Sequence, residues 1–390
     1  MPLSAREIMI ELIITVDYEL FNNGGGHVQR DMIEPTNRLL AICDRHAAKL
    51  TIMLEIGQYW AMKQAEQALQ HDLGYSPAQA METQVQLALG SGHDIQLHLH
   101  PQWIGAEYRD KMWHLNFHQI RLCDLDDAQK GDSASLPLAG VLRRGKETLE
   151  ALLRPVDASY ECNAFRAGGF YIEPGDRIIE AMRRVGLWAD SSVVPGYVAD
   201  EPLPVDFGSV PIGPGYWWTS RRSMTERGRA SEGVLEFPLY AKMKPYLCNF
   251  KPTKFRATLK RRAIERQDPH CQVHSAPQST ASPRSALRKL FSSNAMKFDI
   301  CKLSAGDMFR MFAWAVQQQA AGPNGGFCPV VCLGHSKDFW NDVALDAFLG
   351  RISSHRKYRS EFHWNTLGGI VGQILTESQH SLNAHATAKG

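Results

Sequence analysis

The chain has 390 residues, of which 44% are hydrophobic and 22% charged, and its formal net charge is +2. This composition excludes global disorder, and the small charge gives the chain as a whole no electrostatic reason to bind nucleic acid. No apolar run approaches the roughly 18 residues that a membrane span requires.

The N-terminal part of the chain alternates between strand and helix patterns. Short apolar, β-branched runs predict buried strands, and apolar residues at helical spacing predict helices between them. In chain order these are a strand at Leu12–Val16, a helix from Pro35 to about Ala47, a strand at Leu50–Ile56, a helix at Gln79–Leu89 and a strand at Ile95–Leu99. This order predicts a parallel sheet or barrel with right-handed crossovers.

The middle of the chain continues the same alternation less regularly. The patterns predict a helix at Val141–Leu153, a strand at Cys162–Arg166, a helix at Asp176–Val185 and a strand at Leu187–Ser191. Glycine and proline then crowd residues 195–216, which predicts a long loop.

Residues 249–290 have a different composition. Ten lysines and arginines face two acidic residues there, a local charge of +8, and the stretch from Ser275 to Ser285 is rich in serine, proline and glutamine. We expect a flexible basic insertion. It is either simply solvated or a contact for an anionic partner such as membrane headgroups.

The C-terminal part returns to regular elements. Ser304 is expected to cap a helix that runs to about Gln319, followed by a buried strand at Pro329–Leu333 and a helix at Ala344–Ile352. We therefore expect one catalytic domain over residues 8–376, interrupted by the insertion, and a disordered tail over residues 377–390.

The eight cysteines are widely and irregularly spaced, which predicts free thiols rather than a disulfide framework. Cys328 and Cys332 have no second pair nearby to complete a zinc site. Glu11 interrupts the N-terminal apolar run, so we expect no export signal and a cytoplasmic protein, with peripheral contact to the inner membrane face through residues 249–290.

Polar residues end the predicted strands, and this is the most informative feature of the sequence. They are Asp17, Glu19, His98, His100, Arg166, Asp190 and His335. In a parallel barrel all these strand ends lie on one face, where the loops build active sites. Any one of them could be a satisfied core residue, but five strands that end in this way favour a site.

His98 and His100 are two residues apart on a strand and so point to the same side. Two imidazoles in this arrangement can share one cation, and a carboxylate from the first strand, Asp17 or Glu19, can complete a facial site with open positions. The sequence therefore predicts a divalent metal, with zinc as the first choice.

Taken in order, five short motifs resemble those of the polysaccharide deacetylases, the NodB-homology group of carbohydrate esterases. They are Thr15-Val16-Asp17-Tyr18, Gly92-His93-Asp94-Ile95 leading to His98, Arg166-Ala167-Gly168-Gly169, Trp188-Ala189-Asp190-Ser191 and Leu333-Gly334-His335. Two positions depart from the family's pattern. Tyr18 replaces an aspartate ligand and Gln102 replaces a histidine ligand, and Glu19 and His100 are the nearby substitutes. The departures leave open a differently built metal site or an inactive protein.

The resemblance implies a distorted (β/α) barrel and a separate catalytic role for each strand-end residue. Asp17 is expected to be the general base, and Arg166 to pair with it and keep it ionised. His335, on the opposite wall, is expected to protonate the leaving amine. Asp190 is expected to orient Arg166 or His335. The roles of Asp17 and Glu19 stay interchangeable at this stage.

Aromatic residues in or after strand-end loops could stack on a sugar. Together with Gly169, the candidates for substrate binding are Trp103, Trp113, Tyr171, Trp217 and Trp218. Buried packing is the alternative for Trp217 and Trp218.

The resemblance implies a metal-dependent hydrolase that removes an N-acetyl group from an amino sugar of a surface-polysaccharide precursor, such as a lipid- or nucleotide-linked glycan. Two alternatives remain. The same barrel could hydrolyse another amide or a ureide, or the chain could be a sugar-binding protein without catalytic activity.

Overall fold

A curved sheet of nine strands forms the centre of the fold, and the computed structural model describes it within residues 9–125, 137–200, 203–245, 293–319 and 326–387. The strand order is β10-β11-β7-β6-β3-β2-β1-β14, and β15 pairs with β1. The parallel strands are β1 (Met9–Tyr18), β2 (Leu50–Glu55), β3 (Asp94–Leu99), β6 (Ala164–Ala167), β7 (Ala189–Asp190), β11 (Leu235–Glu236), β14 (Phe327–His335) and β15 (Phe362–Asn365), and β10 (Trp217–Trp218) runs antiparallel at the edge.

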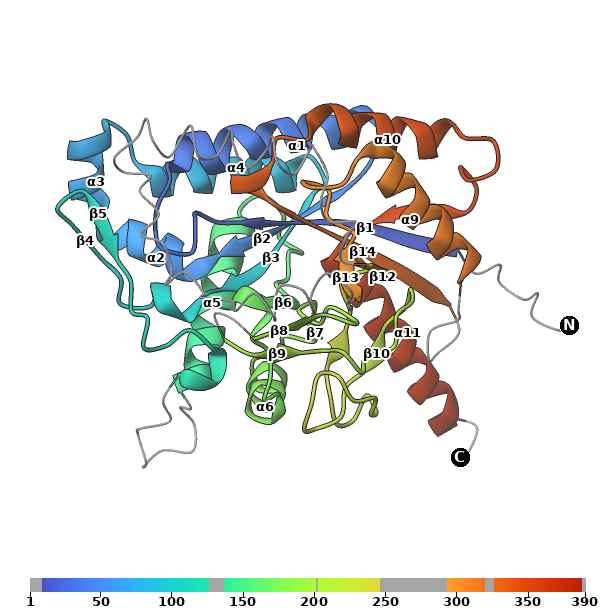
Figure 1. Ribbon diagram of the computed structural model, residues 1–390. Coiled ribbons are helices and arrows are strands. Elements are labelled where there is room, and N and C mark those ends of the chain that lie inside the picture. Colours follow the sequence, from blue (N-terminus) through green and yellow to red (C-terminus); the bar gives the residue numbers. More distant parts are fainter. Residues whose placement is uncertain (1–8, 126–136, 201–202, 246–292, 320–325, 388–390) are drawn as a thin grey trace, which may run out of the picture.

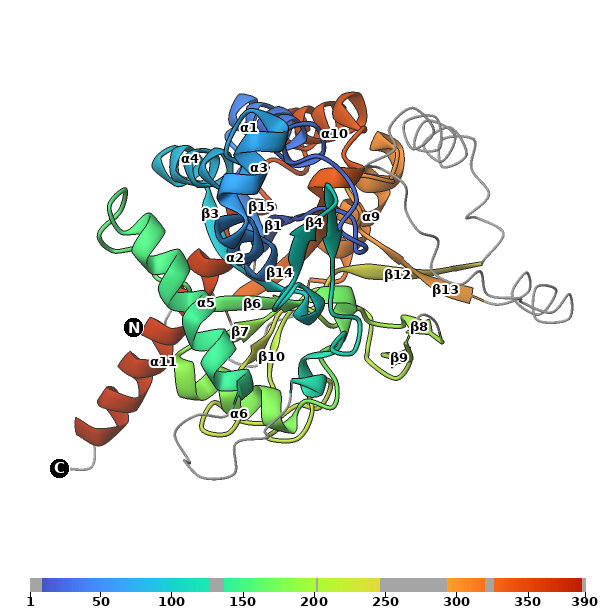
Figure 2. The same ribbon diagram turned by 90° about the vertical axis from the view of Figure 1, so that its left-hand side faces the viewer.

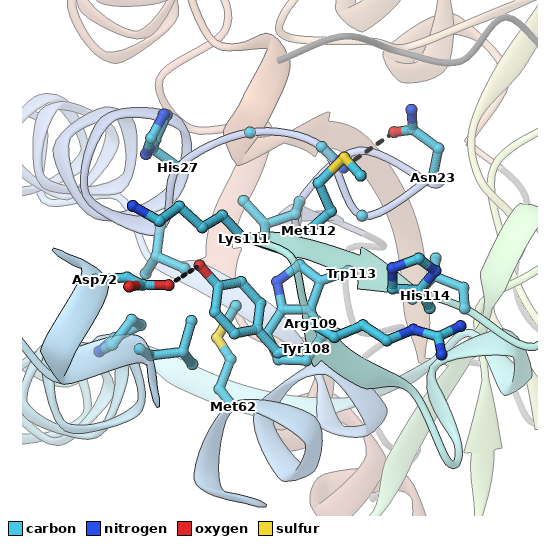
Figure 3. Close-up of a pocket in the computed structure, with 18 of the residues that line it drawn as sticks. Asn23, His27, Met62, Asp72, Tyr108, Arg109, Lys111, Met112, Trp113 and His114 are labelled. Carbon is cyan, nitrogen blue, oxygen red and sulfur yellow. Dashed lines mark hydrogen bonds between the residues drawn. The ribbon is translucent and has the colours of Figure 1, made fainter. Parts of the chain in front are cut away.

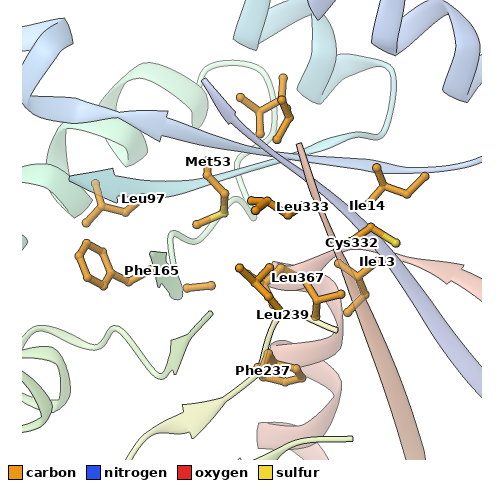
Figure 4. Packing of buried hydrophobic residues seen from close by; sticks show 14 of the residues in the cluster. Ile13, Ile14, Met53, Leu97, Phe165, Phe237, Leu239, Cys332, Leu333 and Leu367 are labelled. Carbon is orange, nitrogen blue, oxygen red and sulfur yellow. The ribbon is translucent and has the colours of Figure 1, made fainter. Parts of the chain in front are cut away.

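Single bridges close this sheet into a distorted barrel. The backbone N–H of Leu239 donates to the carbonyl of Val193, which follows β7, and the N–H of Tyr240 donates to the carbonyl of Val331 in β14, each at 2.9 Å. The segment after β11 thus reaches the far edge of the sheet. Figure 4 shows side chains from opposite walls, among them Met53, Phe165 and Leu333, converging in the interior. The predicted (β/α) barrel is confirmed, with closure by isolated bridges in place of a full ladder.

Helices cover the outside of the sheet, with α1, α4 and α10 on one side and α5, α6 and α11 on the other (Figure 1). Their bounds are α1 (Glu34–Arg45), α2 (Ile56–Gln64), α3 (Glu66–Leu73), α4 (Pro77–Gly90), α5 (Pro137–Leu153), α6 (Asp176–Val185), α9 (Ala305–Gln317), α10 (Asp342–Ser354) and α11 (Leu367–Thr387). Local chemistry sets several ends. The Ser304 hydroxyl accepts a hydrogen bond from the N–H of Asp307 at 3.1 Å, as predicted, and Gly186 ends α6 at φ 75°. None of the described helices has the length and apolar content to cross a bilayer.

Short hairpins and single helical turns lie at the end of the barrel where the parallel strands finish. The hairpins are β4 (Glu107–Arg109) with β5 (Met112–His114), β8 (Val198–Ala199) with β9 (Val205–Asp206), and β12 (Ala241–Pro245) with β13 (Ser293–Lys297). Single helical turns are η1 (Val28–Ile33), η2 (Pro101–Trp103), η3 (Leu122–Asp124), η4 (Gly168–Phe170) and η7 (Ser336–Asp338). Figure 2 shows the β4–β5 hairpin in front of the sheet, and β12–β13 near β8–β9.

The predicted strands and helices that fall on described residues are all present, and three differences stand out. Helices α2 and α3 were not predicted. The loop over residues 195–216 contains the small hairpin β8–β9. Helix α11 continues to Thr387, into the range expected to be a disordered tail. It is anchored because Ile370, Val371 and Ile374 are buried.

The basic stretch 249–290 lies outside the described residues, so the insertion and its anionic partner stay predictions. The six cysteines that the structure describes are free thiols.

Candidate functional site

The polar strand ends meet on one face of the barrel, as the sequence predicted. The parallel strands β1, β2, β3, β6, β7, β11 and β14 finish at the same edge, so their last residues converge. The residues brought together there are Asp17, Glu19, Glu55, His98, His100, Arg166, Asp190, Glu236 and His335. All except His335 are buried.

One carboxylate oxygen faces both histidines of β3. Oε2 of Glu19 lies 2.8 Å from Nε2 of His100 and 3.4 Å from Nε2 of His98. With Glu55, these residues each offer a ligand atom within 4.8 Å of one another. The structure therefore brings together the three residues that the sequence predicted as metal ligands.

The hydrogen bonding of His98 shows which of its nitrogens is free. Nδ1 lies 2.8 Å from the backbone carbonyl of Arg166, which can only accept, so Nδ1 carries the proton. Nε2 faces Oε2 of Glu19 at 3.4 Å, and it is buried without a hydrogen-bond partner among the described residues. A lone pair that faces a carboxylate needs a proton or a cation between them. This orphaned nitrogen is the observation that a metal ion fits.

Gln102 stands where the family has a histidine ligand, and it supports His100 instead. Its Nε2 lies 3.1 Å from Nδ1 of His100, and its Oε1 is buried without a partner among the described residues. In this arrangement Nδ1 accepts and Nε2 of His100 donates to Glu19. A 180° rotation of the amide would place Oε1 against Nδ1, move the proton there and free Nε2 for a cation.

Three charged residues of the site were not predicted: Glu55, Lys337 and Glu236. Glu55 ends β2 and was read as part of a continuous apolar strand. Its Oε1 accepts from the N–H of Gly57 at 3.0 Å, which caps α2, and its Oε2 accepts from the N–H of His100 at 2.7 Å. Burial raises the pKa of Glu55 to about 7. Its position at a strand end was the available signal.

Lys337 is the second unpredicted residue. Its ammonium lies 2.7 Å from Oε1 of Glu19 and also donates to the Leu20 carbonyl and the Asn22 side chain, at 3.0 and 3.1 Å. Burial opposes ionisation of Glu19, but Lys337 and His100 hold the pKa of this carboxyl well below its usual range. Lys337 thus fixes one oxygen of Glu19 and leaves Oε2 to the imidazoles. Its positive charge also weakens the attraction of the site for a dication.

Asp17 pairs with Arg166, as predicted. Nη1 of Arg166 lies 2.6 Å from Oδ1 of Asp17, and the rest of the guanidinium donates to the backbone and hydroxyl of Ser191 at 2.8 and 3.1 Å. Burial raises the pKa of Asp17, but Arg166, His98 and His335 outweigh it, so the pKa is lowered. Asp17 is therefore a carboxylate with Oδ2 unblocked by the arginine.

His335 lies beside Asp17, and the expectation that it occupies the opposite wall is wrong. The two residues are paired in register on the neighbouring strands β1 and β14, and Nε2 of His335 is 3.5 Å from Oδ2 of Asp17. Chain order does not reveal which strands become neighbours, and β1 and β14 come from opposite ends of the sequence. Burial lowers the pKa of His335.

Asp190 was expected to orient Arg166 or His335 directly, but its hydrogen bonds go to Ser192. Its carboxylate accepts from the N–H and hydroxyl of Ser192, both at 2.8 Å, and no described hydrogen bond joins it to Arg166 or His335. The Ser192 hydroxyl in turn accepts from the N–H of Ala167, beside Arg166, at 2.8 Å. Glu236, which was not predicted, is paired in register with Asp190, and burial raises the pKa of both carboxyls.

Four of the five predicted sugar-stacking rings lie in the packed core, and the fifth, Trp113, is partly exposed. Trp103, Trp217 and Trp218 are 2%, 6% and 7% exposed, and Tyr171 is buried, so none presents an open face. Trp217 and Trp218 form the edge strand β10, where they pack. Gly169 adopts φ 62°, and a Cβ there would meet the ring of Tyr171 at 2.5 Å, which explains the glycine by close packing.

A cavity of about 560 Å³ lies beside this cluster, and Figure 3 shows its lining. It begins at Leu20, next to Glu19, and runs between the glycine-rich loop 23–28 and the β4–β5 hairpin. Tyr108 and Trp113 line it, and Trp113 packs edge-on against Trp103 with ring centroids 5.4 Å apart. The predicted ligands do not line this cavity, so it adjoins the metal-ligand cluster without containing it.

The electrostatics of His98 give a testable consequence of metal binding. Burial lowers its pKa, but Asp17 and Glu19 outweigh this and raise it to about 9. Without metal the imidazole therefore carries a proton at pH 7, and a cation must displace it. We expect zinc binding at pH 7 to release about one proton, and the apparent affinity to rise about tenfold per pH unit until pH approaches the pKa.

Calorimetric titration with zinc in two buffers of different ionisation enthalpy measures the released proton. The His98→Gln variant is the control, because it lacks both the ligand and its proton and should show neither zinc binding nor proton release. Zinc binding without proton release by the unaltered chain would contradict the assignment of His98 as a ligand.

No family model and no curated protein matches this chain. Similar solved structures include a probable polysaccharide deacetylase from Pseudomonas aeruginosa PAO1, at 12% identity over 92% of this chain and 89% of that chain, with a TM-score of 0.40. They also include the allantoinase PuuE, at 12% identity over 94% of this chain and 90% of that chain, with a TM-score of 0.42. A GH57 branching enzyme from Thermococcus kodakaraensis is similar at 11% identity over 92% of this chain and 70% of that chain, with a TM-score of 0.41. The likeness to polysaccharide deacetylases that the motifs predicted is thus found again among solved structures.

Proposed function

We propose that this protein is a metal-dependent hydrolase that removes the acetyl group from an N-acetylated amino sugar. The observation that carries the proposal is the convergence of Glu19, His98 and His100 on one point, with Nε2 of His98 lacking a hydrogen-bond partner and the Asp17–Arg166 pair alongside. One carboxylate and two imidazoles form the facial donor set of a hydrolytic metal site.

Glu19, through Oε2, and the Nε2 atoms of His98 and His100 are the residues that would hold the cation. When bound there, a divalent ion supplies Lewis-acid polarisation of the amide carbonyl and of a water molecule. Lys337 keeps Glu19 ionised and fixes its other oxygen. The backbone carbonyl of Arg166 keeps the proton of His98 on Nδ1.

Asp17 acts as the general base. Arg166 holds its Oδ1 and keeps the carboxylate ionised, and Oδ2 is left to accept a proton from water. His335, 3.5 Å from that oxygen, can take the proton onward and deliver it to the leaving amine. Because burial lowers the pKa of His335, its protonated form gives up the proton readily.

The sugar itself is proposed to lie in the cavity that begins at Leu20. Tyr108 and Trp113 are partly exposed there and can stack on the apolar face of a pyranose. The buried rings of Trp217 and Trp218 are left with a packing role. The proposal includes that the sugar is part of a surface-polysaccharide precursor and is linked to a lipid or a nucleotide.

The test is acetate release from N-acetylated chito-oligosaccharides by zinc-loaded protein, together with metal analysis. We expect about one divalent ion per chain, loss of that ion in His98→Ala, and loss of acetate release in the same variant and after chelation. His93→Ala is a matched control, since His93 is a buried histidine outside the cluster, held by Asp44 and the N–H of Leu50. If a His98→Ala, His100→Ala double variant still held one metal ion per chain, these histidines would not be the metal ligands.

One observation favours a second candidate, a sugar-binding protein without metal. Lys337 already neutralises Glu19, and a protonated His98 would complete the charge balance of the cluster. Metal analysis separates the two. Binding of chito-oligosaccharides without any bound divalent ion at neutral pH would identify the chain as a sugar-binding protein. Acetate release separates deacetylation from hydrolysis of another amide or a ureide.

A further inference from the structure

Lys297 is a half-buried ammonium that the proposed chemistry does not use. It ends β13, and its Nζ lies 4.2 Å from the centroid of the Phe170 ring and 4.6 Å from that of Tyr197. These two rings come from different loops, one after β6 and one after β7, and stand at 76° to one another. Lysine, phenylalanine and tyrosine thus form a cage built from three separate segments.

The cage stands at the catalytic face of the barrel. Phe170 follows Gly168, and a Cβ on Gly168 would lie 2.4 Å from Cγ of His100, so this loop packs directly on a proposed metal ligand. Lys297 is also close enough to Asp17 and Arg166 for their charges to act on its ammonium. The ammonium therefore lies near the reacting groups, on a different segment from the cavity at Leu20.

The ammonium has no carboxylate in direct contact among the described residues, although the charge of Asp299, two residues along the chain, acts on it. Burial lowers the pKa of Lys297 to about 8, which records the loss of hydration. Phe170 adopts φ 64°, a backbone conformation that a phenylalanine rarely adopts. Among the residues that the structure describes, no carboxylate forms an ion pair with Lys297, and Asp17 is taken by Arg166. The rings offer a cation–π attraction but no hydrogen-bond acceptor for the ammonium.

We propose that Lys297 binds an anionic group of the sugar substrate, a phosphate or a carboxylate, so that the protein selects charged N-acetylated amino sugars over neutral ones. The substrate part of this inference rests on the proposed function. An anion completes what the cage lacks, because it supplies both a counter-charge in direct contact and the acceptor for the ammonium protons. Phe170 and Tyr197 hold the side chain in place and exclude water from the contact.

The experiment measures sugar binding to zinc-loaded protein by ligand-observed NMR, with N-acetylglucosamine, N-acetylglucosamine 1-phosphate and N-acetylmuramic acid as probes. We expect at least one charged sugar to bind roughly tenfold more tightly than the neutral one, the size of a charge-assisted hydrogen bond. Comparison of the two charged probes tells whether the anion is a phosphate or a carboxylate.

Lys297→Met keeps the apolar stem in the cage and removes the charge, so it should abolish the preference while the melting temperature stays close to that of the unaltered chain. Lys302→Met is the matched control. It removes a positive charge from the same segment, but Lys302 is half exposed and pairs with Asp299 and Asp338, so the preference should survive. Equal binding of all three sugars by the unaltered chain, or a preference that persists in Lys297→Met, would overturn the inference.

The acetate methyl signal in the same NMR samples separates this inference from the proposed function. A charge preference that Lys297→Met abolishes, without acetate release from any probe, would uphold the anion site and defeat the deacetylase. Acetate release from neutral and charged sugars alike, unaffected by Lys297→Met, would uphold the deacetylase and defeat the anion site.

Discussion

Asp17→Asn is expected to lower acetate release by ~10²–10⁴-fold while the metal content stays unchanged. An amide cannot accept the proton of the attacking water, but it keeps the shape of the side chain and can still contact Arg166. Because Asp17 touches neither imidazole of β3 among the described hydrogen bonds, its loss should leave Glu19, His98 and His100 in place. Steady-state kinetics and metal analysis on the same preparation measure both effects.

Glu19→Gln is the matched variant, since it makes the same chemical change two residues away. We expect it to lose the metal, because Oε2 is the atom that faces both imidazoles, at 2.8 and 3.4 Å. The opposite pattern, with metal lost in Asp17→Asn and kept in Glu19→Gln, would show that the two carboxylates have exchanged roles. Their sequence spacing alone allowed either assignment.

Arg166→Met is expected to destabilise the fold by about 3–5 kcal/mol, the cost of leaving a buried carboxylate without its partner. Arg166 is 0% exposed, and its guanidinium satisfies Asp17, the Ser191 carbonyl and the Ser191 hydroxyl. Urea unfolding of the metal-free protein measures the loss. The pKa of Asp17 should also rise, because the largest influence that lowers it is removed.

Two further variants separate charge from packing. Adding Asp17→Asn to Arg166→Met removes the unpaired charge, so part of the lost stability should return. Arg38→Met breaks an ion pair of similar length, 2.7 Å to Asp342, but both side chains are well exposed, and its cost should stay below about 1 kcal/mol. A similar small cost for Arg166→Met would show that Asp17 is not held by a buried pair.

Six strands of the sheet, and the face on which they end, followed from the sequence, whereas β10, β11 and β15 were not predicted. Periodicity identified β1, β2, β3, β6, β7 and β14, and the parallel alternation fixed that their last residues lie together. Glu19, His98 and His100 followed from that reasoning, because a spacing of two places two histidines on the same side of a strand. The Asp17–Arg166 pair was also predicted, from the family resemblance.

The packing between distant segments decided the rest. Lys337 reaches Glu19 across 318 residues of sequence, and no local pattern reports such a contact. The pairing of β1 with β14 put His335 beside Asp17 and not across from it. The aromatic residues of β10 were placed by composition near a sugar site, but an edge strand packed on the barrel buries them. Local sequence determines the period of an element and where it ends, because those depend on backbone geometry and neighbouring side chains. Which strands become neighbours, and which charged side chains meet between them, depends on the closure of the barrel, and only the tertiary structure contains that information.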